Sequence, residues 1–383
     1  IYRGRVIFGC ADGWIYCLRA TDGSLAWRFR AAPSDTLCTS YGQLESVWPA
    51  HGSVLVRDGT VYTVAGRSMF LDGGLRMLLL DARTGEKVSE NVMDNRHPET
   101  GRSLQHELQW PNLPTTLPDV LSCQNGKIYM RGQEFDLSGR RTDVHLSLAY
   151  GRQSGEGSHL FSPTGFLDDS WWHRSYWIYG RTYIGGAFGW WTSAHFAPAG
   201  RPLAMDDSCV YGFARRRKNY RVTRKQGYKL FASRRHPEIV GAESKVSREV
   251  PESRRYGTAP RGVRRGIIES RPRYRWRVKS PPFHARAVAL AGDIFFAAGP
   301  PDVVDERHIF QDPIDAQEQK KLKQQEAALE GEEGMILWAL LAEDGERLSE
   351  LSLQSSPIFD GMCAARGRLL ICRKDGTVVC LGK

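Results

Sequence analysis

Alternating apolar and polar positions at both ends of the chain predict antiparallel hairpins of short strands. Near the start, residues 4–8 (GRVIF) lead through Asp12-Gly13 to residues 14–18 (WIYCL). Near the end, residues 367–381 repeat this order with the same spacing around Asp375-Gly376. Asp-Gly between two alternating runs is a strong hairpin signal, because a type I′ turn needs positive φ at both central residues. Each run is therefore expected to be a strand.

A second short motif follows the hairpins and repeats along the chain. Leu, Ala two positions later and Gly five positions later, with Thr or Asp before the Gly, occur together at 18–23, 80–85 and 340–345. A degenerate copy stands at 135–139. The motif predicts the end of one strand, a tight turn and the entry into an outer strand such as 24–30. Internal repeats of this kind are typical of propellers and solenoids.

The repeats are unevenly spaced. The equivalent glycines lie at positions 4, 59, 126, 292 and 367, wider apart than the roughly 40–50 residues of common propeller repeats. The gaps must therefore contain insertions, and the stretch from 126 to 292 must contain one or two further units, with 179–186 and 208–214 as its best strand candidates. A four-stranded unit alone would expose two apolar faces, so neighbouring units are expected to stack around a ring.

One stretch departs from the strand pattern and predicts a helix over about 312–333. Asp312 would cap this helix, Pro313 suits its first turn, and helix-forming residues fill 317–329. Its apolar stripe is thin, so a solvated helical insertion or lid over 300–334 is expected. A helix that binds a partner is the alternative.

The repeated pattern resembles that of the quinoprotein-like (PQQ-like) propeller family, and Gly4 to Trp27 follow the family pattern nearly throughout. The resemblance covers about half of the chain, at 4–30, 46–92, 117–143, 284–352 and 356–383. It implies an all-β propeller of about six to eight four-stranded blades, with residues 1–383 as a single domain. In the family, the Trp that ends each repeat packs between blades. Trp27 is expected to be the only one kept, because Ser89, Asp143 and Ser349 stand at the matching positions.

The ends of the chain predict an incomplete ring. Ile1 leads directly into a strand pattern, which suggests that the true N-terminus and any signal peptide are missing. The first visible blade would lack its inner strand, and the last would have an inner strand over Pro357–Ala365 but no outer strand. An isolated chain would then expose a sheet edge and aggregate. No apolar run approaches eighteen residues, so no transmembrane helix is expected; an extracytoplasmic location is implied by the resemblance alone.

The resemblance implies two different functions. Some members of the family are calcium-dependent alcohol or sugar dehydrogenases that hold pyrroloquinoline quinone (PQQ) on the propeller axis, and others are scaffolds without a cofactor. The alcohol-type enzymes use vicinal cysteines over the quinone, whereas none of the eight cysteines here is adjacent to another. Calcium prefers six to eight oxygen ligands, and the chain has no acidic ligand run. A scaffold without a cofactor is therefore favoured, and PQQ with Ca²⁺ is the alternative.

The most unusual stretch for chemistry lies in the weakly repetitive middle of the chain. Residues 166–177 combine carboxylates, an imidazole, a guanidinium and indoles, and a Gly/Trp cluster follows at 185–191. The acids and the histidine suit a metal site or an acid/base group, and the indoles suit a stacking wall for a sugar or a quinone. Alternatively, the tryptophans only fill the space between blades while Asp169 pairs with Arg174. The candidate ligand-binding residues are Asp168, Asp169, Trp171, Trp172, His173, Arg174, Trp190 and Trp191; no catalytic residue is assigned, and any metal stays unidentified.

Positive charge is concentrated in one segment. Residues 215–279 hold 22 Lys/Arg against five Glu, a balance of +17, although the whole chain carries only +10. The plain interpretation is a basic loop inserted between blades, partly disordered through 236–262. The alternative is a surface for an acidic polymer or for membrane headgroups, since arginines interleave with aromatic residues there, as at 271–277. The basic patch is predicted at Arg215, Arg216, Arg217, Lys218, Arg264 and Arg265.

Three functional hypotheses follow. The leading one is a non-catalytic binding or scaffold propeller that presents loops to a protein or to an anionic polymer. The first alternative is a PQQ- and calcium-dependent dehydrogenase. The second alternative is binding of an acidic polymer or a membrane surface through the basic segment. Sequence-specific recognition of nucleic acid is not expected, and the oligomeric state stays open.

Overall fold

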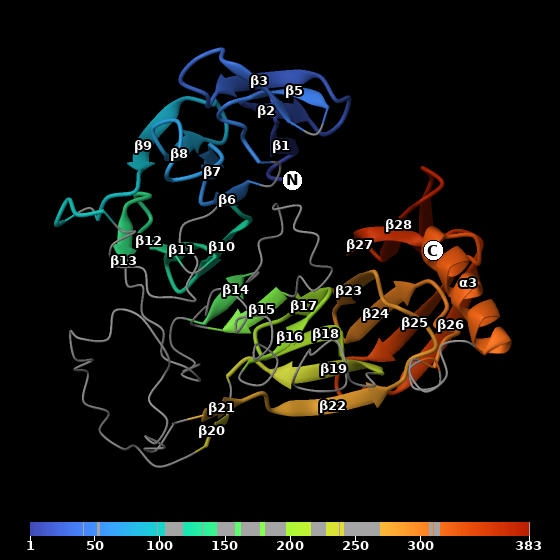
Figure 1. The fold of residues 1–383 in the computed structure, drawn as a ribbon. Coiled ribbons are helices and arrows are strands. Elements are labelled where there is room, and N and C mark those ends of the chain that lie inside the picture. Colours follow the sequence, from blue (N-terminus) through green and yellow to red (C-terminus); the bar gives the residue numbers. More distant parts are fainter. Residues whose placement is uncertain are drawn as a thin grey trace.

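The structure is a computed structural model that describes the chain apart from residues 41, 52–53, 98, 104–117, 132, 144–157, 162–176, 181–196, 216–226, 237, 241–268, 306–308, 310–314 and 383. Its described strands form antiparallel sheets, seven of which have three or four strands. These seven sheets follow one another along an arc in chain order (Figure 1). The chain is an all-β propeller, as the repeats predict, and the seven described blades fall within the predicted number.

The blades differ in their number of strands. Four blades have four strands: β6–β9 (Leu55–Arg57, Thr60–Ala65, Leu75–Asp81, Lys87–Met93), β10–β13 (Leu121–Gln124, Lys127–Met130, Gln133–Phe135, Arg141–Asp143), β17–β18–β19–β22 (Leu203–Met205, Cys209–Arg215, Tyr228–Arg234, Tyr274–Lys279) and β23–β26 (Ala287–Ala291, Ile294–Gly299, Met335–Leu341, Arg347–Leu353). Three blades have three described strands: β1–β3 (Arg5–Gly9, Trp14–Arg19, Leu25–Arg30), β14–β16 (His159–Phe161, Trp177–Gly180, Ala199–Gly200) and β27–β29 (Pro357–Ala365, Arg368–Arg373, Val378–Gly382). Two small hairpins stand outside the blades: β4–β5 (Leu37–Ser40, Gln43–Ser46) and β20–β21 (Glu238–Val240, Glu269–Arg271).

The turns that join the strands are of two kinds. Asp58-Gly59 joins β6 to β7 with φ of 48° and 84°, and Asn125-Gly126 joins β10 to β11 with 49° and 74°. These are two-residue turns with positive φ at both positions, as a type I′ turn requires. At Asp12-Gly13, by contrast, only the glycine has positive φ, of 86°, and its N–H bonds to the carbonyl of Cys10 at 3.1 Å. The prediction of a type I′ turn at Asp12-Gly13 is therefore wrong in type, although the hairpin itself is confirmed.

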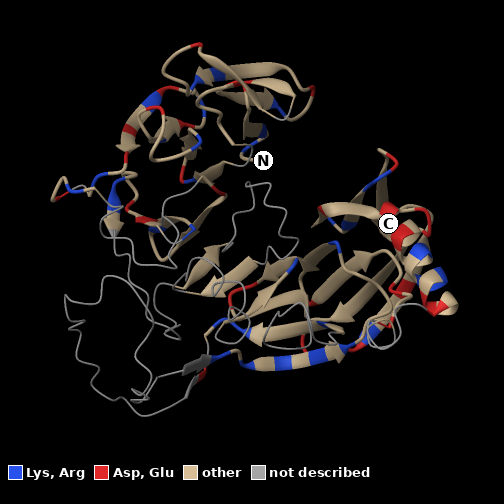
Figure 2. Ribbon diagram, in the orientation of Figure 1, with Lys and Arg blue, Asp and Glu red and all other residues tan. Residues whose placement is uncertain are grey.

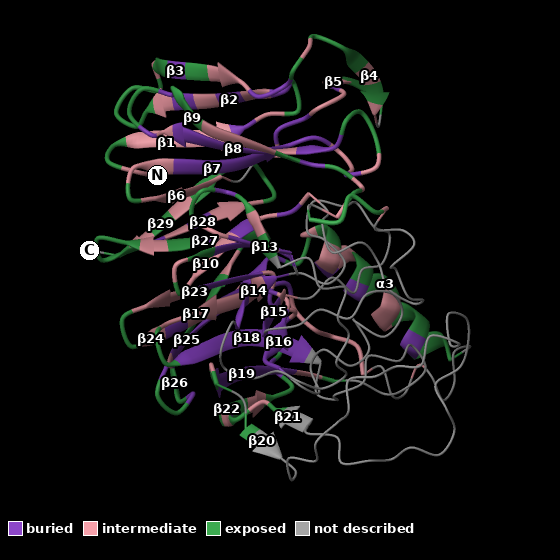
Figure 3. Ribbon diagram, turned by 90° about the vertical axis from the view of Figure 1, so that its left-hand side faces the viewer, coloured by how far each residue is buried: buried purple, intermediate pink, exposed green. Residues whose placement is uncertain are grey.

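The hydrophobic core lies between successive blades. Ile15 and Cys17 of β2 pack with Leu78 and Leu80 of β8, all of them buried. A similar cluster joins the β17–β18–β19–β22 blade to the β23–β26 blade. In Figure 3, buried residues follow the middle strands of the blades and exposed residues gather in the turns and on outer strands. Each blade therefore buries its apolar faces only by packing on its neighbours, as the repeat argument requires.

A tryptophan docks the first blade on the second. Trp27 of β3 donates its Nε1–H to the carbonyl oxygen of Ala82 at 3.2 Å. Gly85 lies directly against the indole, and a Cβ at that position would stand 2.6 Å from Trp27. The absence of a side chain at Gly85 is what lets the ring approach.

The same docking occurs a second time, where the sequence did not predict it. Trp276 of β22 donates its Nε1–H to the carbonyl oxygen of Ala342 at 2.9 Å, and a Cβ at Gly345 would lie 2.7 Å from the indole. The expectation that Trp27 alone keeps this role is therefore wrong. Between β9 and the β10–β13 blade, Asn91 takes the place of the indole and donates from Nδ2 to the carbonyl oxygen of Ser138 at 3.0 Å.

The basic segment is not a single inserted loop. It contains β19 and β22, the third and fourth strands of a blade, and Leu230, Phe231 and Trp276 are buried within that blade. The predicted insertion over 215–279 is thus too wide, because alternating apolar residues at its ends belong to strands. The predicted strand at 208–214 is confirmed as β18. Of the one predicted at 179–186, only the start belongs to β15, and the rest lies outside the described residues.

The helix is shorter than predicted and starts later. Helix α3 runs over Ala316–Glu330, and Asp315 caps it by accepting from the N–H groups of Gln317 and Glu318 at 2.8 and 3.0 Å. Asp312, the expected cap, lies outside the described residues. Arg286 and Lys374 donate to the carbonyl oxygen of Leu329 at 2.6 and 3.0 Å, so two cations hold the C-terminal end, where the helix dipole favours positive charge. No helix in the described part of the chain is long and apolar enough to cross a membrane.

Candidate binding surface

Most of the predicted site residues lie outside the part of the chain that the structure describes. They are Asp168, Asp169, Trp171, Trp172, His173, Arg174, Trp190, Trp191, Arg216, Arg217, Lys218, Arg264 and Arg265. Arg215 is the last residue of β18, and the placement of its side chain is likewise not described. The stacking wall and the predicted basic patch therefore stay predictions.

The clearest concentration of charge in the described residues lies on β22, the outer strand of its blade (Figure 2). Over 271–279, every second residue is basic and exposed, and the stretch contains no acidic residue. The five are Arg271, Arg273, Arg275, Arg277 and Lys279. Arg271 belongs to β21 and Arg273 to the connection, whereas Arg275, Arg277 and Lys279 stand on β22 itself. Side chains two residues apart on a strand lie about 6.6–6.8 Å apart along it, so these three charges form a row along the outer strand. Sequence reasoning assigned this row to the inserted loop and left it out of the predicted patch.

Two other outer strands, β9 and β26, provide an internal comparison for β22. In each of the three blades, the pairing between the third strand and the outer strand shifts register at one β-bulge. The outer-strand residue paired next to this bulge is Ser89 in β9, Trp276 in β22 and Ser349 in β26, so these three positions are equivalent. The residues before and after the aligned position are Val88 and Glu90 in β9, Leu348 and Glu350 in β26, and Arg275 and Arg277 in β22. Where its two sister strands carry an apolar and an acidic residue, β22 therefore carries two arginines.

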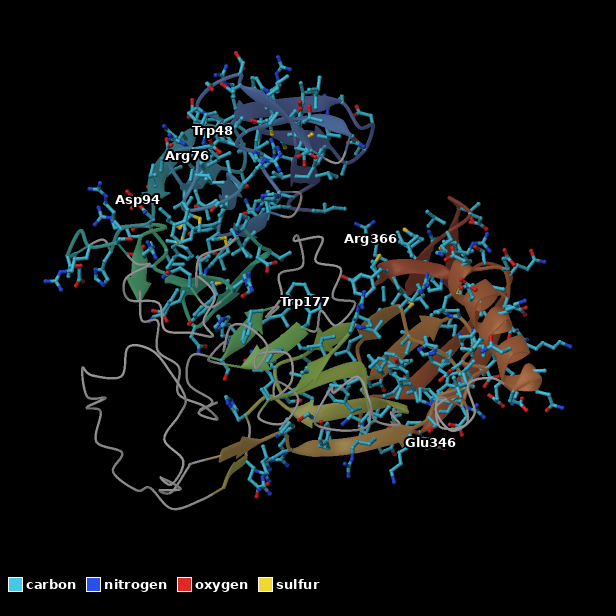
Figure 4. All side chains as sticks on the ribbon, in the orientation of Figure 1. Trp48, Arg76, Asp94, Trp177, Glu346 and Arg366 are labelled. Atoms are coloured by element: carbon cyan, nitrogen blue, oxygen red, sulfur yellow. The ribbon has the colours of Figure 1, made fainter. Side chains whose placement is uncertain are left out.

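The glutamates of the sister strands neutralise basic residues of their own blades. Glu90 accepts from Lys87 at 2.7 Å and pairs with Arg76, which Figure 4 labels. Glu350 accepts from Arg347 at 2.6 Å. Formal charges thus cancel on β9 (KVSENVM) and β26 (RLSELSL), whereas β22 (YRWRVK) carries +3. β3 (LAWRFR), the outer strand of the first blade, also carries two arginines, of which Arg30 pairs with Asp35 at 2.9 Å. Among the described outer strands, β22 therefore carries the largest formal charge.

The charges of β22 have little acidic compensation among the described residues. Arg275 lies 3.5 Å from Glu343, but the two side chains are 43% and 75% exposed. An exposed pair at that distance is screened by solvent and contributes little. Lys279 stands directly opposite Lys229 in the β19–β22 register. Like charges at directly opposed positions are unfavourable, so the sheet maintains this surface against an electrostatic cost.

Aromatic residues pack beneath the charges. Tyr274 meets Phe231 edge to face with ring centroids 5.5 Å apart, and the guanidinium of Arg277 lies 5.1 Å from the Tyr274 ring centroid. Lys229 is buried and donates from Nζ to the Tyr274 hydroxyl at 3.0 Å. Burial raises the pKa of Tyr274 to about 12 although Arg277 opposes the rise, so the phenol stays neutral at physiological pH. The cluster holds the cations in place and adds no negative charge.

A second polar cluster joins three blades. Arg235, just after β19, donates from Nη2 to Gln124 Oε1 and to the Tyr179 hydroxyl, both at 2.7 Å, and from Nη1 to the carbonyl oxygen of Asp206 at 3.1 Å. Its guanidinium also lies over the Tyr179 ring, 4.9 Å from the centroid. Because its bonds to Gln124 and Tyr179 join its own blade to two others, this arginine serves as a structural clamp.

A third cluster is buried between the β10–β13 and β14–β16 blades. His159 stacks on Tyr129 with ring centroids 3.8 Å apart, and its Nε2 lies 2.8 Å from the carbonyl oxygen of Arg131. Arg131 and Asp119 approach to 3.9 Å with both side chains only 1% exposed. A buried cation paired with a buried anion inside a junction between blades is typical of a structural contact. Sequence reasoning missed this cluster, because its members come from separate strands and share no motif.

The described residues do not form a donor set for calcium. No three of the Asp, Glu, His and Cys side chains in the described part of the chain come together as a metal site would require. Calcium takes six to eight oxygen ligands, and the described carboxylates do not gather to supply them. Asp168 and Asp169, the remaining candidate ligands, lie outside the described residues.

Comparison with known proteins gives likeness of fold alone. No protein-family model and no curated protein matches the chain. Similar solved structures include BamB from Moraxella catarrhalis, 12% identical over 100% of this chain and 83% of that one, with a TM-score of 0.41. A quinohemoprotein alcohol dehydrogenase from Comamonas testosteroni is 13% identical over 97% of this chain and 54% of its own, with a TM-score of 0.34. The β-propeller domain of Cps50 (Swd1) from Myceliophteria thermophila is 7% identical over 98% and 92%, with a TM-score of 0.38. At these identities the likeness assigns neither activity nor partner.

Proposed function

We propose that the chain is a non-catalytic binding propeller that holds an anionic macromolecule against its outer strand β22. The observation that supports the proposal is the charge of this strand. Arg275 and Arg277 replace the apolar and acidic residues of the sister strands, and no glutamate within β22 balances them.

The fold suits such a role because the strand fixes the positions of the charges. Trp276 is buried and docked on the next blade, while Arg275 and Arg277 on either side of it are exposed. The backbone of β22 is thus ordered before any partner binds, and fewer degrees of freedom are lost on binding than with a flexible basic loop. Exposed cations in a row also attract a polyanion from a distance, most strongly at low ionic strength.

The test is binding to labelled polyanions across a series of salt concentrations. Poly-L-glutamate, heparin and a thymidine oligonucleotide serve as probes, each measured by fluorescence anisotropy. Arg275→Gln with Arg277→Gln removes two charges from β22. The control, Arg83→Gln with Arg140→Gln, removes two exposed charges from turns of the β6–β9 and β10–β13 blades. On a single-stranded polyanion, each lost contact lowers the slope of log affinity against log salt by about 0.7.

The expected result is salt-dependent binding of at least one probe, a slope lower by about 1.4 in the β22 variant, and an unchanged slope in the control. Equal slopes in the two variants, or no binding at low salt, would overturn the proposal. The proposed function needs no cofactor. Addition of PQQ with Ca²⁺ is therefore expected to give neither a rise in melting temperature nor dye reduction with alcohols or aldoses, and either response would favour the dehydrogenase hypothesis instead.

A further inference from the structure

Among the described residues, the backbone of β22 has an edge without a neighbouring strand, beside its charged side chains. The sheet order is β17-β18-β19-β22, and none of the described strands pairs with the outer edge of β22. Ser280 N–H bonds to the carbonyl oxygen of Tyr228 at 2.9 Å, and these two residues stand opposite each other in the register. Hydrogen-bonded and non-hydrogen-bonded pairs alternate along an antiparallel ladder. The N–H and C=O groups of Arg277 and Lys279 therefore point away from β19, to the open edge.

From this edge we propose that the anionic partner is an extended acidic polypeptide segment that pairs with β22 as an additional strand. The inference rests on the proposed function and specifies its partner. An added strand shares the two-residue repeat of β22, so an acid at every second position meets the basic row in register. Opposite charges at facing positions of paired strands attract, and the main-chain hydrogen bonds supply affinity beyond charge.

The surroundings of the row favour a polypeptide over a nucleic acid. Single-stranded nucleic acids bind by stacking their bases on exposed aromatic rings. Phe231 is fully buried, and Tyr274 is occupied by Phe231, Lys229 and Arg277. The described part of this surface thus offers charge and backbone but no free ring. A second copy of the strand is disfavoured too, because two strands with a charge of +3 repel each other, which is how basic residues protect an edge from self-association.

The main experiment compares peptides that differ only in backbone or in order. The probe is a ten-residue peptide that alternates glutamate with threonine. One control has five glutamates followed by five threonines, and another is the alternating peptide N-methylated on every amide, which keeps the charge but cannot donate to a strand. Each is titrated into the full chain by fluorescence anisotropy. We expect the alternating peptide to bind at least about tenfold more tightly than either control, a difference of roughly 1.4 kcal/mol.

Two measurements on the protein locate the contact. Hydrogen exchange is expected to slow at the amides of Arg277 and Lys279 when the alternating peptide binds. Arg277→Pro removes an N–H group that points away from β19 and makes no hydrogen bond in the β19–β22 pairing, a position at which edge strands tolerate proline. Arg277→Gln is the control, because it removes the same charge but keeps the N–H. The proline variant should bind more weakly than the glutamine variant. The melting temperature of each variant shows whether the blade stays folded. The methylated peptide tests the need for backbone hydrogen bonds on the unaltered chain.

The outcomes separate this inference from the proposed function. Equal binding of the alternating, block and methylated peptides, with the β22 charge variant still weakened, would reject strand pairing but keep a polyanion surface. Tighter binding of heparin or of the oligonucleotide than of the alternating peptide would assign the surface to a polysaccharide or to a nucleic acid. No loss of any binding in the β22 charge variant would reject both.

Discussion

Replacement of Gly345 by alanine tests the second, unpredicted tryptophan dock. Gly345 has φ of 80°, and an added Cβ would lie 2.7 Å from the indole of Trp276. Gly376 is a matched control, because its φ is 79° and nothing lies within 4 Å of an added Cβ. Both substitutions place alanine in the left-handed region, but only one of them collides with a ring.

The two costs are separable in magnitude. A residue with a Cβ in the left-handed region costs about 1–2 kcal/mol, and this is the whole expected cost of Gly376→Ala. Overpacking of a filled site adds typically about 1–3 kcal/mol. Gly345→Ala is therefore expected to lower the free energy of unfolding by about 2–5 kcal/mol.

Equilibrium urea unfolding of the two variants and of a double-mutant cycle checks these values. Trp276→Ala alone should cost about 3–5 kcal/mol, because it empties a packed site. In that background the collision is gone, so Gly345→Ala should cost no more than Gly376→Ala does. The coupling between the Trp276 and Gly345 substitutions would then be about 1–3 kcal/mol. Equal costs for the two glycine variants in the native background, or additivity in the cycle, would refute the docking argument.

Three further predictions concern protons and capping. The pKa of Asp81 is lowered by the N–H groups of Thr84 and Arg83, and that of Asp206 is lowered because the N–H groups of Cys209 and Ser208 outweigh its burial. Both carboxylates therefore stabilise the fold in full above their ordinary value of 3.8, and this contribution is lost as the pH falls through their lower folded values; Asp206→Asn should flatten the fall in melting temperature between pH 5 and pH 2. Tyr274 should titrate at about 12, as should Tyr16, and the pKa of Tyr211 is raised further by burial. The phenolate step near 12 in an ultraviolet titration should therefore lose part of its amplitude in Tyr274→Phe, and a loss of amplitude near 10 instead would contradict the burial of Tyr274. Asp315→Ala should destabilise α3 by about 0.5–2 kcal/mol, seen as faster amide exchange at Gln317 and Glu318 but unchanged exchange in β25.

The ends of the chain were predictable because local turn signals accompany each strand pair. The strand pattern and the Asp-Gly dipeptides predict the hairpins of β1–β2 and β28–β29 without reference to the rest of the fold. The turn type at Asp12-Gly13 was not predictable from the dipeptide alone. The turn type depends on how many residues separate the two strands. β1 ends at Gly9 and β2 begins at Trp14, so this connection is longer than the two-residue turns, in which both residues have positive φ.

Trp276 was missed because its strand is separated from the rest of its blade in sequence. β19 ends at Arg234 and β22 begins at Tyr274, so the fixed distance between third and fourth strands that identifies Trp27 fails here. The local sequence did hold a signal. Trp27 and Trp276 are each followed by an arginine and then by an apolar residue, Phe29 or Val278. A search for that short pattern, free of spacing, would have found the dock.

The start of α3 shows the same effect on a smaller scale. Both Asp312 and Asp315 precede helix-forming residues, and Pro313 favours the earlier start. Asp315 is followed three residues later by Glu318, the spacing of a capping box, and the structure shows Asp315 as the cap. The proline at 313 and the capping box at Asp315 favour different starts for the helix. The proline is the weaker signal, because its fixed φ near −65° also suits backbone outside a helix.

Buried and charged residues alternate along β22, which explains why its composition did not predict a strand of the blade. Trp276 and Val278 face the next blade and pack in its core cluster, while Arg275, Arg277 and Lys279 face solvent. The overall composition of the strand is that of a basic segment. The alternation of Trp276 and Val278 with basic residues is that of an outer strand packed on the next blade. The separation also means that substitutions at Arg275 and Arg277 leave the indole contact with Ala342 untouched. Loss of binding without loss of stability is therefore the result that distinguishes a binding surface on this blade from a structural one.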